Sequence, residues 1–140
     1  MTFILRKAFD SDIEKIKPYA EKLNLDTKDM NPRKFYIVSN KGQIAGFGRR
    51  KNYKNICELA TIGVLENHRR TGIGELLVNK LIKEASAEEI WLTTIIPEYF
   101  TKFGFKTSNN EPEELFLKSR RICKKFGKPP ALNVFMRLES

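Results

Sequence analysis

Cysteine and histidine are scarce in this chain. Its 140 residues include two cysteines, Cys57 and Cys123, and one histidine, His68. The cysteines are far apart and form no Cys-x-x-Cys pair, which argues against a metal cage and favours reduced thiols. No apolar run approaches the roughly 20 residues that a membrane-spanning helix needs. The first residues become charged too soon for a secretory signal, so we expect a cytoplasmic protein that does not bind membranes.

Acidic residues are outnumbered by basic ones. The chain has 26 Lys and Arg against 17 Asp and Glu, a formal net charge of +9. This balance predicts attraction to a polyanion such as nucleic acid, an acidic membrane or a phosphate-rich cofactor. A basic surface that only aids solubility is equally consistent with it. No basic motif interleaved with aromatic residues is present, so nucleic acid is not the expected partner.

Hydrophobic periodicity predicts alternating strands and helices. We expect the first helix to open with a capping box of Ser11 and Glu14 and to be bent or interrupted by Pro18. The other expected elements are strands at 3–5, 35–39, 44–48, 59–65, 90–96 and 133–138, and helices at 75–85, 97–104 and 112–127. This order, in a chain of single-domain length, predicts a mixed α/β domain.

The segment from Val64 to Gly74 joins a predicted buried strand to a predicted helix. Gly72 and Gly74 allow the main chain to approach a ligand closely and to adopt positive φ. N–H groups converge at the start of the helix, and Arg69 and Arg70 add positive charge, which together favour a bound phosphate. An ordinary strand-to-helix turn with a solvated basic face is the alternative.

Two motifs resemble those of the GNAT superfamily of N-acetyltransferases. Arg69-x-x-Gly72-Ile73-Gly74 resembles its acyl-CoA loop, Arg/Gln-x-x-Gly-x-Gly/Ala, and Tyr99-Phe100-x-x-Phe103-Gly104-Phe105 is similar to its late Phe-Tyr-x-x-x-Gly-Phe motif. The resemblance covers residues 3–107. It implies one domain over 1–140, with a core at 3–107 and a C-terminal helix and strand at 108–140.

The fold implied by this resemblance is a central mixed, mostly antiparallel sheet flanked by helices, with a V-shaped splay between the strands at 59–65 and 90–96. Acetyl-CoA would lie in that splay. Its pantetheine arm would pair with the backbone of residues 62–64, and the amides of residues 70–74 would hold its pyrophosphate. The implied cofactor-binding residues are Ile62, Gly63, Val64, Arg69, Arg70, Thr71, Gly72, Ile73 and Gly74.

Glu58 lies six residues before Val64 on the same predicted strand, and even spacing puts both side chains on one face. A glutamate at this position resembles the base of histone-acetylating and amino-acid-acetylating family members. The resemblance implies that Glu58 acts as a base through water and that the Val64 N–H stabilises the oxyanion. A strand-edge carboxylate paired with a surface lysine is the alternative for Glu58.

Phe100 stands where the family has a tyrosine, and Tyr99 lies one residue earlier, about 100° round a helix. The sequence therefore departs from the family at the general acid, but a thiol with a pKa of about 8.5 can leave with little protonation. Tyr99 is interpreted as a packing residue or an acceptor contact. Arg49, at the end of the hairpin, could hold an acceptor carboxylate or belong to a solvated basic surface.

The predicted function is transfer of an acetyl group from acetyl-CoA to a primary amine. A small-molecule acceptor such as an amino acid is favoured, because residues 58–60 and 134–136 are similar to short N-acetylglutamate-synthase-like proteins. The alternatives are a protein or peptide acetyltransferase, a non-catalytic acyl-CoA-binding module and a basic nucleic-acid-binding module. The sequence is compatible with a monomer or a homodimer, and it leaves open the acceptor, the acyl chain length and the role of residues 108–130.

Overall fold

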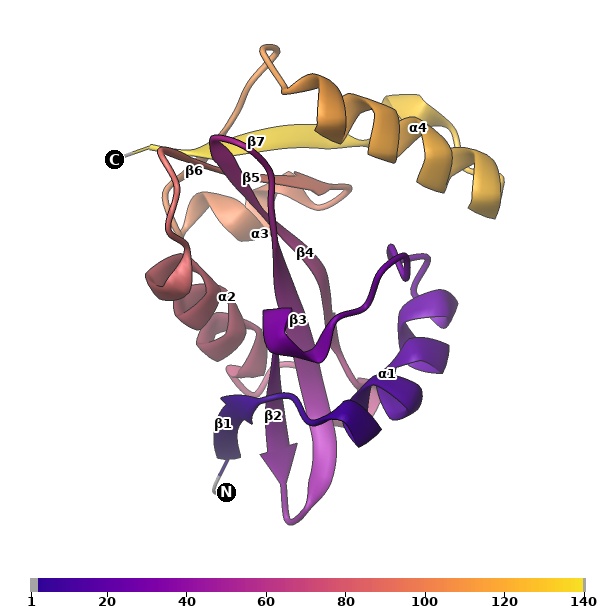
Figure 1. The fold of residues 1–140 in the computed structure, drawn as a ribbon, viewed down its shortest axis with the longest axis vertical. Helices are drawn as coiled ribbons and strands as arrows, with labels where there is room; N and C mark the ends of the chain where they lie inside the picture. The colour runs from indigo at the N-terminus through magenta and orange to yellow at the C-terminus, as the bar shows by residue number, and fades with distance from the viewer. Residues whose placement is uncertain (1–2, 140) are drawn as a thin grey trace. The chain divides into compact units, whose positions relative to one another are not determined.

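The computed structural model describes residues 3–139. The elements are β1 (Phe3–Lys7), α1 (Asp10–Lys22), β2 (Phe35–Asn40), β3 (Gln43–Asn52), β4 (Ile56–Val64), α2 (Ile73–Glu84), β5 (Glu89–Thr94), α3 (Pro97–Thr101), β6 (Phe105–Thr107), α4 (Glu113–Phe126) and β7 (Val134–Leu138) (Figure 1). The strands hydrogen-bond in the order β1-β2-β3-β4-β5-β7-β6. The pairs β1–β2, β2–β3, β5–β7 and β6–β7 are antiparallel, and β4–β5 is parallel. The expected mixed α/β fold class is confirmed.

The chain divides into two compact units that share β4. The first unit comprises Met1–Lys51 and Leu59–Ser86, and the second comprises Asn52–Glu58 and Ala87–Ser140. In the second unit, residues 56–58 of β4 pair in parallel with residues 89–91 of β5. The strand then continues into the first unit, where it leads to the Gly72 loop.

In the first unit, α1 and α2 cover opposite faces of the strands (Figure 1). The α1 face holds a hydrophobic cluster of Ile16, Ala20, Phe35, Ile37 and Phe47. On the α2 face, a Cβ built on Gly46 would come within 2.6 Å of Ile73 and 3.1 Å of Leu77. Glycine in β3 therefore lets α2 approach the strand backbone closely, and α2 is the helix that begins at the predicted phosphate loop.

Helix α1 begins differently from the expectation. Asp12, not Ser11 or Glu14, caps it, because the Asp12 carboxylate accepts a hydrogen bond from the Phe9 N–H at 2.6 Å. Ser11 already lies inside the first turn. Pro18 does not interrupt the helix, which runs unbroken from Asp10 to Lys22. Burial of the α1 apolar face in the hydrophobic cluster outweighs the one hydrogen bond that proline removes.

In the second unit, α4 packs on the sheet through Leu115, which forms a core cluster with Ile56 and Trp91. The predicted helix start at 112–114 and its end at Gly127 are confirmed, and Gly127 has the left-handed φ of 65° that favours glycine. Strand β6 was not predicted. It has three residues and is defined by its pairing with β7, which local sequence does not reveal.

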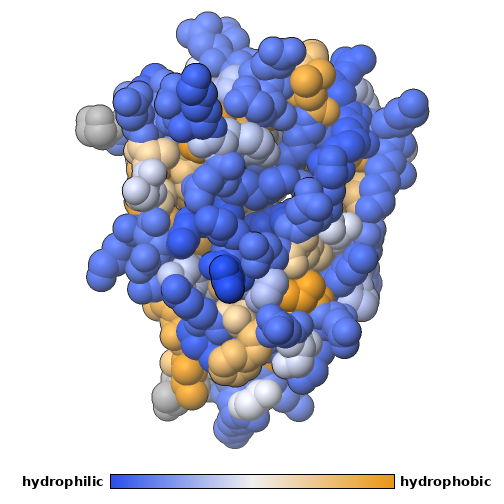
Figure 2. Space-filling view, viewed as in Figure 1, coloured by the Kyte–Doolittle hydropathy of each residue, from blue (hydrophilic) through white to orange (hydrophobic). Residues whose placement is uncertain are grey.

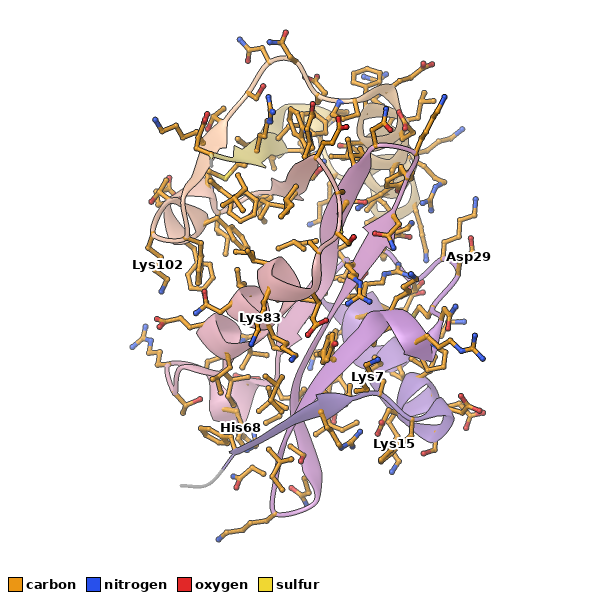
Figure 3. All side chains as sticks on the ribbon, turned by 60° about the vertical axis from the view of Figure 1, so that its left-hand side comes forward. Lys7, Lys15, Asp29, His68, Lys83 and Lys102 are labelled. Atoms are coloured by element: carbon orange, nitrogen blue, oxygen red, sulfur yellow. The ribbon has the colours of Figure 1, made fainter. Side chains whose placement is uncertain are left out.

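Much of the positive charge lies on the surface. Hydrophilic side chains dominate the face drawn in Figure 2, although apolar patches interrupt them. Lys7, Lys15 and Lys83 are exposed and are labelled in Figure 3. Solvated lysines therefore account for part of the net charge without any ligand. Among residues 3–139, no helix is both long and apolar enough to cross a bilayer.

Candidate functional site

The loop between β4 and α2 combines left-handed backbone conformations with the start of a helix. Gly72 is the N-cap of α2, with φ 86° and ψ 3°, and Arg70 also has a positive φ of 65°. No side chain caps the helix. The first N–H groups of a helix have no partner within it, and they carry the positive end of the helix dipole. A Cβ built on Gly72 would meet nothing within 4 Å, so this side of the loop is open.

Side chains within the loop hold its shape. The Thr71 hydroxyl donates to the His68 carbonyl, and the Arg69 Nε donates to the Val64 carbonyl at 3.2 Å. Arg69 and Arg70 are exposed. Ile73 is 1% exposed and its side chain lies against Gly46 of β3, so its side chain is not available to a ligand. The loop therefore offers main-chain donors and two exposed cations, as expected of a phosphate site.

The end of β4 is packed tightly from one side. A Cβ on Gly63 would lie 2.6 Å from a ring carbon of Phe47, so only glycine fits there. The N–H of Leu65 donates to the Ala45 carbonyl at 2.9 Å, which holds the chain beyond the strand against β3. Ile62, Gly63 and Val64 and the residues 69–74 all belong to the first unit. The predicted cofactor-binding residues thus lie on consecutive segments of one compact unit.

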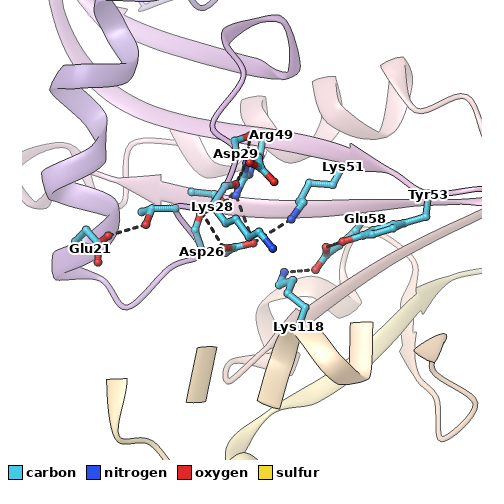
Figure 4. Close-up of polar contacts among 11 residues, drawn as sticks. Glu21, Asp26, Lys28, Asp29, Arg49, Lys51, Tyr53, Glu58 and Lys118 are labelled. Carbon is cyan, nitrogen blue, oxygen red and sulfur yellow. Dashed lines mark hydrogen bonds and ion pairs between the residues drawn. The ribbon is translucent and has the colours of Figure 1, made fainter. Parts of the chain in front are cut away.

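Arg49 does not lie on a solvated basic surface, and that expectation was wrong. The residue is 1% exposed, and its guanidinium donates to the carbonyls of Asp26, Lys28 and Asp29 at 2.8, 2.9 and 3.1 Å (Figure 4). It also donates to the Thr61 hydroxyl at 2.9 Å and lies 3.5 Å from the Asp26 carboxylate. Each of its three nitrogens already has a partner, so holding an acceptor carboxylate would require Arg49 to give up internal contacts.

Glu58 lies at the start of the shared strand, in the second unit, and is fully buried. Its carboxylate pairs with the Lys118 ammonium from α4 and accepts a hydrogen bond from the Tyr53 hydroxyl at 3.3 Å (Figure 4). A pairing with lysine was the alternative interpretation of Glu58, but neither group is a surface residue, since the Lys118 side chain is 13% exposed. A buried carboxylate with one compensating cation is typical of functional sites and also of structural ion pairs.

The regular alternation of β4 is interrupted between Glu58 and Val64. Thr61 has a φ of 51°, in the left-handed region, which a β-branched residue rarely adopts. Strand alternation requires extended backbone at every step. Counting six residues from Glu58 therefore does not establish that its side chain and that of Val64 share a face, and their pairing as base and oxyanion donor stays a prediction.

Aromatic packing explains the positions of Phe100 and Tyr99 on α3. Phe100 is 8% exposed and packs edge-on against Phe105, with ring centroids 6.3 Å apart. Tyr99 is half-buried, lies edge-on to Phe103, and has the Lys102 ammonium 4.4 Å from its ring centroid. Tyr99 thus has the contacts of a packing residue, and an acceptor contact by Tyr99 stays a prediction.

The family model for GNAT acetyltransferases matches residues 3–105 of the chain. The chain belongs to the GNAT acetyltransferase family. Among curated proteins, it is 31% identical over 83 residues to an uncharacterized N-acetyltransferase of Chlorobaculum tepidum. The matched region is 56% of this chain and 54% of that protein, so the match spans about half the length of the curated relative.

Solved structures show the same fold at low sequence identity. The Mycobacterium tuberculosis protein Rv2747, in complex with CoA and NLQ, is 21% identical with a TM-score of 0.78 over 98% of this chain and 99% of that one. N-acetylglutamate synthase from Neisseria gonorrhoeae, complexed with coenzyme A and N-acetyl-glutamate, is 18% identical with a TM-score of 0.74 over 100% of this chain and 36% of that one. These likenesses support the GNAT fold found here.

The sequence analysis did not identify several residues that lie around the candidate site. Tyr53 and Lys118 contact Glu58 from the turn before β4 and from α4, and Lys118 lies outside the residues that match the family model. The only sequence signal for Lys118 was its place in a basic run on a predicted helix. Asp26 and Thr61 carried no signal, because their roles depend on a contact across more than 30 residues. Within residues 3–139, no group of His, Cys, Asp and Glu could hold a metal ion.

Proposed function

We propose that this protein is an N-acetyltransferase that uses acetyl-CoA and acetylates a primary amine, in particular that of a small molecule such as an amino acid. The observation that carries the proposal is the open, uncapped N-terminus of α2, with positive φ at Arg70 and Gly72, in a chain of the GNAT acetyltransferase family. Main-chain amides at such a terminus favour a pyrophosphate, whose charge complements the helix dipole.

Acetyl-CoA would supply an acetyl group that is already activated as a thioester. The amides of residues 70–74 would hold its pyrophosphate, and the exposed guanidinium groups of Arg69 and Arg70 would add charge. The backbone of residues 62–64 would pair with the pantetheine arm. These segments fit the group chemically, because they provide main-chain donors and cations with no carboxylate side chain from residue 67 to residue 74.

Glu58 is the proposed base, and its carboxylate would receive the proton of the acceptor amine through water. Lys118 and Tyr53 each donate to one of its oxygens, but a carboxylate has about four acceptor positions. The Val64 N–H is the proposed oxyanion donor, which is worth about 3 kcal/mol in comparable sites. The thiolate can then leave without a tyrosine acid, consistent with the buried Phe100.

An amino-acid acceptor is favoured by the structural neighbours. The Neisseria gonorrhoeae enzyme is a synthase of N-acetylglutamate, and it was solved with N-acetyl-glutamate. Its likeness to this chain is one of fold, so the acceptor must be determined by experiment. Arg49 is not the proposed recognition group for an acceptor carboxylate, because its donors are already used inside the first unit.

The test is a screen of amines with acetyl-CoA, in which free thiol release is measured and each product is identified by mass spectrometry. Glutamate, other amino acids, polyamines and a lysine-bearing peptide form the four arms, and Glu58→Gln is the matched inactive control. We expect turnover with one or more amino acids that is lost in Glu58→Gln. Turnover with only polyamines or only the peptide would reject the amino-acid class, and no acetylated product in any arm would reject the enzyme itself.

A further inference from the structure

Thr61 has a strained backbone in the middle of β4. Its φ of 51° brings the branched side chain close to the neighbouring main chain, a conformation that persists only when the surrounding structure holds it. The residue is 5% exposed, so solvent does not stabilise it. The three residues that follow it are Ile62, Gly63 and Val64, whose main-chain groups are assigned above to the pantetheine arm.

Two hydrogen bonds fix the Thr61 side chain. Its hydroxyl accepts from the Arg49 Nε at 2.9 Å and donates to the Asp26 carbonyl at 2.8 Å. A hydroxyl has one proton, so both its donor role and its acceptor role are specified here. The side chain is thereby held between Arg49 of β3 and Asp26 in the loop that follows α1.

Arg49 hydrogen-bonds to three main-chain carbonyls of the loop at 26–29. Its terminal nitrogens donate to the carbonyls of Asp26, Lys28 and Asp29. The Asp26 carboxylate compensates the charge, at 3.5 Å from Arg49 and 3.1 Å from Lys51. Without the guanidinium, the carbonyls of Lys28 and Asp29 and the threonine hydroxyl would lose this donor together, and the Asp26 carbonyl would keep the Thr61 hydroxyl as a donor. One side chain therefore couples the loop at 26–29 to the strained residue of β4.

We propose that Arg49 is a positioning residue for acetyl transfer, because it clamps Thr61 in the left-handed conformation and so aims the amides of residues 62–64. If Thr61 relaxed to an extended conformation, the next peptide would rotate and the direction of those amides would change. The inference rests on the proposed function, and it assigns Arg49 to the geometry of the acetyl-CoA arm instead of to the acceptor.

The first experiment compares Arg49→Met and Thr61→Val with Ile37→Ala. Ile37 is fully buried in the hydrophobic cluster of the same unit, so its truncation lowers stability without removing a hydrogen bond of the clamp. For each folded variant, we would measure the Kd of acetyl-CoA, kcat and the melting temperature. The clamp variants should bind about tenfold more weakly and lose up to about 100-fold in kcat, the effect of a small misplacement of reacting groups. Ile37→Ala should keep the wild-type Kd.

A double variant tests whether Arg49 affects acetyl-CoA binding through the backbone conformation of Thr61. Glycine adopts positive φ without a clamp, so Arg49→Met/Thr61→Gly should bind acetyl-CoA more tightly than Arg49→Met alone. Equal or weaker binding by the double variant would overturn the proposal. It would also be overturned if Arg49→Met lowered the melting temperature while Kd and kcat stayed at the wild-type values, since Arg49 would then be structural only.

Hydrogen exchange separates this inference from the proposed function, because it needs no ligand. In Arg49→Met, the amides of residues 26–29 and 62–64 should exchange faster than they do in Ile37→Ala. Unchanged exchange at 62–64 would reject the clamp whatever the binding result. Faster exchange there, in a protein whose wild type binds no acetyl-CoA, would support the clamp while the proposed function fails.

Discussion

Each unit buries an ion-paired network, one around Arg49 and one around Glu58. The two networks differ in how many hydrogen bonds their central charged side chain makes and in whether its partners are main-chain or side-chain groups. In the first unit, Arg49 is 1% exposed and donates through every guanidinium nitrogen, mostly to main-chain carbonyls. In the second, the buried Glu58 carboxylate is held by two side chains, Lys118 and Tyr53. The first arrangement fixes main-chain geometry, whereas the second holds the carboxylate that is the proposed base.

The largest expected effect falls on the chemistry of the second unit. Glu58→Gln should lower kcat/KM by about 10²- to 10⁴-fold, the usual contribution of a general base. Stability should fall as well, because Lys118 and Tyr53 contact different oxygens of Glu58, glutamine keeps only one accepting oxygen, and the Lys118 ammonium loses its counter-charge. Steady-state kinetics and a thermal melt on the same sample check both parts. A Glu58→Gln enzyme with wild-type activity would mean that this network supplies no base.

Removal of the cation at Glu58 should mainly affect stability. Lys118→Met leaves a fully buried carboxylate without its ammonium partner, which should reduce the free energy of unfolding by about 3 kcal/mol. The double variant Glu58→Gln/Lys118→Met should recover much of this loss without recovering activity. Urea denaturation of the three variants measures the coupling. A loss below about 0.5 kcal/mol in Lys118→Met would mean that the pair is effectively solvated.

Lys51 marks the solvent side of the first network. Its side chain is 20% exposed and forms an ion pair with the Asp26 carboxylate. When Lys51 is replaced, Asp26 still has Arg49 as an ion-pair partner. Lys51→Met should therefore reduce the free energy of unfolding by only about 1 kcal/mol, the upper end for accessible pairs. Urea denaturation beside Lys118→Met gives the comparison directly. An equal loss in both variants would remove the distinction between the two networks.

An effect of the same size as that of Lys51→Met is expected at the start of α1, outside both networks. The Arg6 guanidinium, hydrogen-bonded to Asp12, holds the pKa of that carboxyl below its ordinary value of 3.8. The resulting stability is present above the ordinary pKa and is lost as the pH falls through the lowered one. Asp12→Asn should reduce the free energy of unfolding by about 1 kcal/mol at neutral pH and by little in strong acid.

The matched control for Asp12→Asn is Glu14→Gln, on an exposed carboxylate of the same helix. The free energy of unfolding is measured at several pH values from neutral to acidic. For Asp12→Asn it should approach the wild-type value as the pH falls. For Glu14→Gln it should stay close to the wild-type value at every pH. A stability difference for Asp12→Asn that is constant over the whole range would contradict the ionic origin of this contact.

Sequence predicted the parts of the fold and the site that depend on local pattern. Gly72 before α2 and Gly127 at the end of α4 were identified because glycine favours such positions, and both have positive φ. Strand ends were less accurate: β3 reaches Asn52, and β4 begins at Ile56, where it pairs with Glu89 of β5, 33 residues later in the chain. The solvated interpretation of Arg49 failed because Asp26 lies 23 positions earlier and only the fold brings it to the guanidinium.

The measurement that tests the central claim most directly is a thermal melt with and without acetyl-CoA, on wild type, Gly72→Val and Gly42→Val. Both glycines have positive φ, 86° and 79°, and open space at the Cβ position, but Gly42 lies in the β2–β3 turn. Acetyl-CoA at 100 times its Kd stabilises a fold by about 2.7 kcal/mol, which should raise the melting temperature by about 8–12 °C. The account predicts this rise in wild type and Gly42→Val and its loss in Gly72→Val. No rise in wild type at millimolar acetyl-CoA, or an undiminished rise in Gly72→Val, would contradict it.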